Sequence, residues 1–301
     1  MTGRTQGILM LLVASLIWGT AFVAQSVGME HVGPFTFNGA RFLVGALVLT
    51  PVIWLNSRTL SGKGKSEKPA SSKLLMKGGL YCGLIIFVSS TLQQMGILHT
   101  TVGKAGFITS LYIVIVPLLG LFLRKKVDGL IWGCVLLAVA GMYLLCINES
   151  FALNQGDLFI LLCAIGFATH ILVIDHFSPL VDGVKLSALQ FLACSVLSTI
   201  AALLFEQPTW ESILVAWKPI LYTGLLSCGV AYTFQILGQK YVVPVIASLI
   251  LSLESVFAVL SGWIILNEVL TQKEMWGCVL LFIAILLAQM PEFFKKKKSE
   301  V

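Results

Sequence analysis

The six residues WGCVLL at Trp132–Leu137 recur without a change at Trp276–Leu281, 144 positions later. Leu80–Leu84 matches Leu221–Leu225 at an offset of 141 positions. One short identity in an apolar chain can arise by chance, but ordered matches at nearly one offset are much harder to obtain. The sequence therefore predicts two similar halves.

The repeat continues through the other apolar runs. Leu9–Thr20 aligns with Leu158–Thr169, and Gln94 aligns with Gln235. We predict a first repeat over residues 1–148 and a second repeat, with a basic tail, over residues 149–301.

The composition points to the membrane. Of the 301 residues, 57% are hydrophobic and 11% are charged, whereas soluble domains average about 45–50% and about 25%. Mean hydropathy is +0.94. A water-soluble enzyme, a nucleic-acid-binding protein and a disordered scaffold are all poor interpretations, because such a chain has too little polar surface to cover a core.

Apolar runs of the right length are frequent. A hydrocarbon core of about 30 Å needs about 20 residues of helix. We predict an all-α integral membrane protein with ten spans, at 6–26, 35–55, 74–97, 101–123, 129–147, 157–177, 185–205, 217–239, 243–266 and 273–293.

Five spans per repeat is an odd number, so the second repeat must cross the membrane in the opposite sense to the first. Inverted repeats are typical of secondary transporters, in which the two halves exchange conformations around a central site. Channels and lipid-modifying enzymes can also carry repeats.

Lysine and arginine positions predict the orientation. Sixteen of the twenty fall on the side of the two termini, while Lys104, Lys218 and Lys273 fall on the other and Arg41 lies within a span. Basic residues favour the cytoplasmic side. Both termini are therefore predicted to be cytoplasmic, and the basic clusters to be orientation signals rather than a nucleic-acid surface.

Nothing in the sequence predicts a cofactor or a metal. The seven cysteines all lie in apolar runs and show no CxxC or CxxH spacing, so we expect reduced, buried thiols. No GxxxxGK[ST] loop is present, so the chain alone is not an ATP-driven pump.

Glycines spaced as GxxxG, at Gly79 and Gly83 and at Gly129 and Gly133, predict tight packing in the bundle, with dimer contacts as the alternative.

Four further stretches carry a family resemblance: Leu16–Phe22, Phe37–Phe42, Ala105–Tyr112 with Pro117, and Ser252–Ala258 continuing to Asn267 and Glu268. With them, essentially the whole chain resembles the EamA family of the drug/metabolite transporter superfamily. The resemblance implies ten helices in a five-plus-five inverted repeat and export or exchange of small metabolites. Ser255 departs from the family's usual proline, which puts the helix bend there in doubt, and basic residues at 124–126 stand where many relatives are acidic.

Glu254 is the principal ionisable candidate, because a charge in hydrocarbon needs a partner or a function. It lies about midway along 243–266, and its own helical face carries small residues such as Ala247 and Ala258. It is either a substrate or proton-coupling site or a contact between helices.

Two basic residues could pair with charge. Arg41 could bind a substrate carboxylate or phosphate, but outward snorkelling or capping of a helix end is the preferred interpretation. Lys104 lies near the outer surface, where snorkelling is again preferred.

Neutral polar and aromatic residues recur at equivalent places in the two repeats, as a central pocket would need. Each could also serve only to join helices. With Glu254, the substrate-binding candidates are Trp18, Thr20, Gln93, Gln94, Thr109, Tyr112, Thr169, His170, Tyr232 and Gln235.

These observations predict a multi-pass transporter of the inner or plasma membrane, not an enzyme, that moves small metabolites such as amino acids by alternating access. Its expected partners are a small-molecule substrate and membrane lipids, and a monomer and a homodimer both remain open. The alternative is a lipid or isoprenoid carrier of the same fold with a more apolar pocket.

Overall fold

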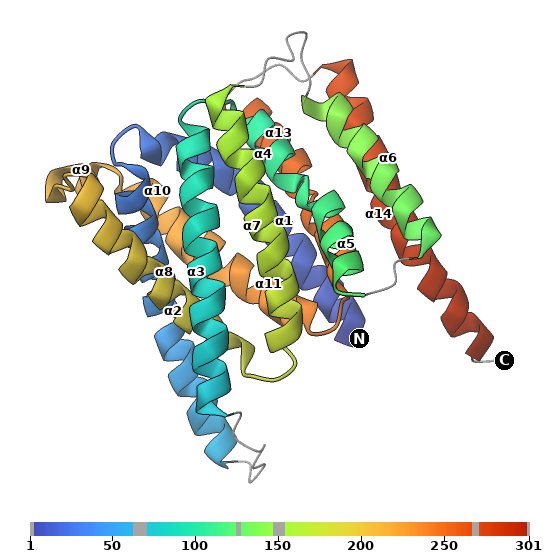
Figure 1. Ribbon diagram of the computed structural model, residues 1–301, viewed down its shortest axis with the longest axis horizontal. Helices are drawn as coiled ribbons and strands as arrows, with labels where there is room; N and C mark the ends of the chain where they lie inside the picture. The colour runs from blue at the N-terminus through green and yellow to red at the C-terminus, as the bar shows by residue number, and fades with distance from the viewer. Residues whose placement is uncertain (1–2, 63–70, 125–127, 147–153, 267–270, 300–301) are drawn as a thin grey trace.

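The computed structural model describes residues 3–62, 71–124, 128–146, 154–266 and 271–299, and within these ranges the chain is helical and forms no strand (Figure 1). The first half holds α1 (Gly3–Met29), α2 (Pro34–Gly62), α3 (Ser72–Ile97), α4 (Val102–Ser110), α5 (Tyr112–Phe122) and α6 (Gly129–Cys146). The second half holds α7 (Gln155–Phe177), α8 (Gly183–Phe205), α9 (Trp210–Val215), α10 (Trp217–Tyr222), the π-helical η1 (Thr223–Tyr232), α11 (Thr233–Gln239), α12 (Pro244–Leu251), α13 (Glu254–Leu266) and α14 (Gln272–Ser299).

Among the described residues, eight helical stretches are long and apolar enough to cross a membrane, and some of them join two or three consecutive elements. They are Gly3–Met29, Pro34–Leu55, Ser72–Ile97, Val102–Phe122, Gln155–Phe177, Gly183–Phe205, Trp217–Gln239 and Pro244–Ile265. The other two predicted spans coincide with shorter apolar stretches, Gly129–Gly141 in α6 and Met275–Ala288 in α14. The chain is therefore a multi-pass membrane protein.

The helices of the two repeats interleave. The most extensive contacts join α2 to α8, α3 to α7 and α8, α6 to α14, and α1 to α13, and each of these pairs one repeat with the other. The same contacts recur with the roles of the two repeats exchanged. α3 packs on α8, and η1, the counterpart of α3 in the second repeat, packs on α2, the counterpart of α8. Figure 1 shows α6 and α14 lying together at one side of the bundle.

Glycines permit two equivalent backbone crossings. A methyl group added at Gly83 would lie 2.8 Å from the carbonyl oxygen of Gln190, and one added at Gly224 would lie 2.9 Å from that of Arg41. Gly83 and Gly224 are repeat counterparts at an offset of 141, and Arg41 and Gln190 at 149. The same close packing of α3 on α8 is thus built again between η1 and α2.

A second pair of crossings follows the same rule. A methyl group at Gly156 would lie 2.8 Å from the oxygen of Gly96, and one at Gly7 would lie 2.9 Å from that of Gly238. Gly96 and Gly238 are separated by 142 positions rather than 141. Between Gly224 and Gly238, the second repeat is therefore one residue longer than the first repeat between Gly83 and Gly96.

The extra residue lies in η1. A π-helix closes its hydrogen bonds over five residues instead of four, which accommodates an inserted residue without leaving the helix. Beyond η1, the offset of 142 pairs Thr91 with Thr233 and Gln93 with Gln235. The predicted match of Gln94 with Gln235 is thereby corrected.

Two spans are broken at equivalent places. The backbone N–H of Leu111 donates to the oxygen of Ile108 between α4 and α5, and that of Leu253 donates to the oxygen of Ile250 between α12 and α13, both at 3.2 Å. Leu111 and Leu253 are counterparts at an offset of 142. These tightened turns separate the two halves of each span.

The break before α13 forms without the family's usual proline. Ser255 stands there and donates from Oγ to the carbonyl oxygen of Ser252 at 2.7 Å. Serine back-bonding of this kind competes with the helical ladder and commonly bends helices.

The glycine pairs predicted to pack tightly behave differently. Gly79 and Gly83 pack on α8, next to Leu189 and Ala193. Around Gly129 and Gly133, by contrast, no described atom lies within 4 Å of an added methyl group. Tight packing is thus confirmed for the first pair and wrong for the second.

We expect Gly83→Ala to destabilise the protein by about 1–3 kcal/mol, because an added methyl group overpacks the crossing. Denaturant titration of the detergent-solubilised protein measures the free energy of unfolding. Gly133→Ala is the matched control, since the same methyl group enters open space there and alanine favours helix by about 1 kcal/mol. Equal destabilisation by both variants would contradict the crossing.

Candidate functional site

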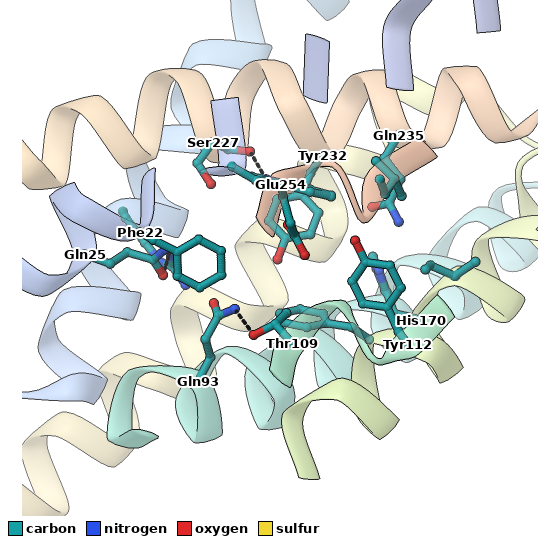
Figure 2. A pocket seen from close by; sticks show the side chains of 15 residues that line it. Phe22, Gln25, Gln93, Thr109, Tyr112, His170, Ser227, Tyr232, Gln235 and Glu254 are labelled. Atoms are coloured by element: carbon teal, nitrogen blue, oxygen red, sulfur yellow. Dashed lines mark hydrogen bonds between the residues drawn. The ribbon is translucent and has the colours of Figure 1, made fainter. Parts of the chain in front are cut away.

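A cavity lies at the centre of the bundle, where helices of both repeats meet. About 470 Å³ of space without protein atoms lies in and in front of it, part of which is open to the outside. Figure 2 shows its walls, to which the breaks between α4 and α5 and between α12 and α13 contribute. Nine sequence-predicted residues line it: Trp18, Arg41, Gln93, Thr109, Tyr112, His170, Tyr232, Gln235 and Glu254.

Four predicted residues are not among the side chains that line the cavity. Thr20 Oγ1 lies 2.5 Å from the hydroxyl of Tyr222, and Thr169 Oγ1 donates to the carbonyl oxygen of Ile165 at 2.9 Å. Gln94 is fully buried, and Lys104 forms an ion pair described below.

Arg41 does not snorkel outward. Its side chain is 2% exposed. Nε donates to Asn38 Oδ1 at 2.9 Å, and Nη1 donates to Gln25 Oε1 at 2.8 Å. The guanidinium also lies 4.9 Å from the ring centroid of Phe42, within cation–π range. Residues of α1 and α2 therefore hold this cation at the cavity.

Glu254 is the first residue of α13 and is 4% exposed. Ser110 Oγ donates to Glu254 Oε1 at 3.4 Å, across the repeat boundary. Tyr112, the first residue of α5, is the repeat counterpart of Glu254, and its hydroxyl interacts with the Glu254 carboxyl. Figure 2 shows both side chains directed into the same space. The two helix breaks thus present a carboxyl and a phenol to one cavity.

The buried charges break the symmetry of the repeats. The repeat counterpart of Arg41 is Gln190, and that of Glu254 is Tyr112. Each charged residue of one repeat is therefore replaced by a neutral residue at the equivalent position of the other. Among the described ion pairs, none joins Arg41 to Glu254. The cavity therefore holds one basic and one acidic group that are not paired with each other.

Aromatic rings form one side of the site. Trp18 and Tyr232 meet edge to face with centroids 4.7 Å apart, and Trp18 Nε1 donates to the carbonyl oxygen of Ser227 at 3.4 Å. His170 Nε2 lies 3.1 Å from Gln190 Oε1. Tyr232 ends η1, so the π-helical segment sets the position of this ring.

Several buried polar atoms at the cavity have no hydrogen-bond partner in the described part of the chain. They include His170 Nδ1 and Gln235 Oε1. Buried polar groups are nearly always satisfied by protein or by bound molecules. These atoms therefore offer donors and acceptors to a ligand or to water.

Lys104 forms an ion pair with Asp157. Their Nζ–Oδ2 distance is 2.6 Å, and Thr100 Oγ1 donates to the other carboxylate oxygen at 3.0 Å. Asp157 also closes a capping box with Asn154 at the start of α7. The ion pair joins α4 to α7 beside the contact of Gly96 with Gly156, and the Lys104 side chain stays 28% exposed.

Sequence reasoning missed six side chains that line the cavity: Phe22, Gln25, Phe167, Ile171, Ser227 and Leu251. Gln25 could have been found, because a glutamine one helix before a buried arginine is a natural partner for it. Phe167 and Leu251 could also have been found, because they are the repeat counterparts of Trp18 and Thr109.

The sequence matches the EamA-like transporter family over residues 5–147 and again over residues 154–290. An uncharacterized transporter of Archaeoglobus fulgidus is 32% identical over 93% of this chain and 84% of that protein. The uncharacterized transporter YoaV of Bacillus subtilis is 26% identical over 92% and 94%. A crystal structure with 19% identity covers 95% of this chain and 97% of its own, at a TM-score of 0.75.

The two matches coincide with the two repeats, and the crystal structure supports the fold. The names of the sequence relatives indicate membrane transporters rather than enzymes. The resemblance found in the sequence is confirmed: this chain belongs to the EamA-like transporter family.

Proposed function

We propose that this protein is a secondary transporter that exports or exchanges small polar metabolites, such as amino acids, by alternating access around the central cavity. One observation carries the proposal. A polar cavity between the two repeats holds a buried arginine and a buried carboxyl that do not neutralise each other. Intramembrane ionisable groups mark substrate and ion pathways.

The proposal includes the full predicted topology. Ten spans, five in each repeat and of opposite sense, put both termini in the cytoplasm of a cell whose inner or plasma membrane holds the protein. The apolar stretches in α6 and α14 and the excess of lysine and arginine on one side support this arrangement.

The two charges favour a substrate that is itself dipolar. A guanidinium binds a carboxylate through two parallel hydrogen bonds, while a carboxyl accepts from an amine. Arg41 and Glu254 could together hold the two charged groups of an amino acid. The amide and hydroxyl groups of Gln93, Thr109 and Gln235 support a polar ligand over an isoprenoid or lipid tail.

The broken spans suggest how access alternates. α4 packs against α13, and α5 packs against α12, so the same two spans touch on both sides of the cavity. A methyl group added at Gly106 of α4 would lie 3.1 Å from Cβ of Ala258 in α13. Separation of α4 from α13 would open the cavity to the outside, and separation of α5 from α12 would open it to the cytoplasm. Breaks of this kind line substrate sites in other transporters.

Substrate and coupling can be tested together in proteoliposomes loaded with mixed amino acids and metabolites. Wild-type protein should release a selected polar compound faster under a pH gradient, measured by mass spectrometry. Glu254→Gln should remove the effect of the gradient, because a glutamine amide cannot bind and release a proton in this pH range. Glu211→Gln, at an exposed position, should retain the effect. Unchanged coupling in Glu254→Gln would make Glu254 a packing residue, and release of no water-soluble compound would favour a lipid carrier.

The role of Arg41 is tested by Arg41→Gln, which installs the residue that repeat two carries at the equivalent place. We expect normal expression and an increase of at least about tenfold in the KM of counterflow, because a hydrogen bond to a charged group contributes about 1.5–3 kcal/mol. Lys218→Gln removes an exposed cation and should leave KM unchanged. An unchanged KM in Arg41→Gln would restrict Arg41 to holding α1 and α2 together.

The outer gate is tested by Gly106→Leu, whose side chain should hold α4 and α13 apart. In a Thr109→Cys background, we expect a membrane-impermeant maleimide added outside to label the cavity several-fold faster. Gly133→Leu, which adds the same side chain in open space, is the control. Faster labelling from the inside only would reverse the assignment of the two gates.

A further inference from the structure

A second hollow lies away from the central cavity, on the outer surface of the bundle between α2, α3 and α8. About 770 Å³ of space without protein atoms lies in and in front of it, part of which is open to the outside. Eight of its ten lining residues are aliphatic, for example Leu43 and Ile53 of α2, Leu75 of α3 and Leu192 of α8. The other two are Lys185 and Thr50, and the Thr50 hydroxyl donates to the carbonyl oxygen of Ala46 in its own helix.

The membrane determines what fills such a groove. Water is absent from the hydrocarbon, so an apolar hollow that opens sideways into it is filled by acyl chains. From Leu43 to Ile53, α2 rises about 15 Å, which is half of the roughly 30 Å hydrocarbon core. The groove thus has the length of one leaflet.

Positive charge gathers at one end of the groove. Lys185 is exposed in the first turn of α8, and Lys73 and Lys77 are exposed in the first turns of α3, on either side of Leu75. Asp182, which directly precedes α8, accepts hydrogen bonds from the backbone N–H groups of Val184 and Lys185 as the cap of that helix. The cap is therefore already engaged, while the three lysine side chains are exposed, with Lys77 Nζ 5.6 Å from the centroid of the Tyr81 ring.

We propose that this groove is a binding site for an anionic glycerophospholipid. One acyl chain lies between α2 and α8, and the phosphate binds Lys185. The site is separate from the transport cavity and belongs to the leaflet in which the basic residues lie. An apolar channel with a cation at its mouth matches the chemistry of such a lipid, whose chain is apolar and whose headgroup is negative.

The groove and the cavity share a wall. Ala188 and Ile53 of the groove pack on a cluster that contains Phe42, Phe191 and Tyr232. Tyr232 lines the central cavity on the other side of this cluster. A bound acyl chain would therefore support the aromatic wall of the transport site from behind.

Native mass spectrometry of the detergent-solubilised full chain tests the headgroup. Phosphatidylglycerol and phosphatidylcholine with the same acyl chains are added in equal amounts. We expect wild-type protein to retain one phosphatidylglycerol in preference, and Lys185→Gln to lower this preference about fivefold, the contribution of one lysine near a membrane surface. Lys240→Gln, an exposed lysine at the end of α11 outside the groove, should keep it. Equal loss in both variants would overturn the proposal.

Ala188→Phe tests the acyl chain by filling the groove. We expect it to lose the retained lipid of either headgroup, whereas Val196→Phe, at an exposed position of the same helix outside the groove, should keep it. Retention by Ala188→Phe would place the lipid elsewhere. Loss of a dimer instead of a lipid would show that a second copy of the chain covers the groove, and would also overturn the proposal.

Discussion

Close approach of backbones, permitted by glycine, is the constraint on which the rest of the structure depends. Lipid is as apolar as a leucine side chain, so helices in a bilayer associate through packing rather than through the hydrophobic effect. Gly83 lets α3 lie directly on α8, and Gly224 lets η1 lie on α2 in the same way. Because each crossing joins one repeat to the other, the polar faces of both repeats turn toward one shared centre.

This shared centre is symmetric in its framework and unsymmetric in its chemistry. The breaks at Leu111 and Leu253 repeat in position and in hydrogen bonding. The charges do not repeat, since only one copy carries arginine at the position of Arg41 and only one carries glutamate at that of Glu254. The two repeats therefore share a framework, while divergence of single residues placed one basic and one acidic group in the cavity.

The sequence predicted the order of the apolar helices and most of the polar cavity wall, because hydropathy and repetition are local properties. It could not show the interleaving of the repeats, which depends on contacts between residues more than a hundred positions apart. It also paired Gln94 with Gln235. The inserted residue in η1 rotates the chain that follows, so Gln93 takes that place, and neither composition nor a short identity reveals a π-helical turn.

Interleaving has a consequence for biosynthesis. α3 leaves the ribosome long before α7 and α8, its principal partners, exist. The first repeat must therefore wait in the bilayer with its packing faces uncovered. Arg41 does not share this delay, because its hydrogen-bond partners Gln25 and Asn38 precede it in the chain. The costliest charge in the first repeat is thus satisfied as it enters the membrane, and the final bundle closes only when the second repeat arrives.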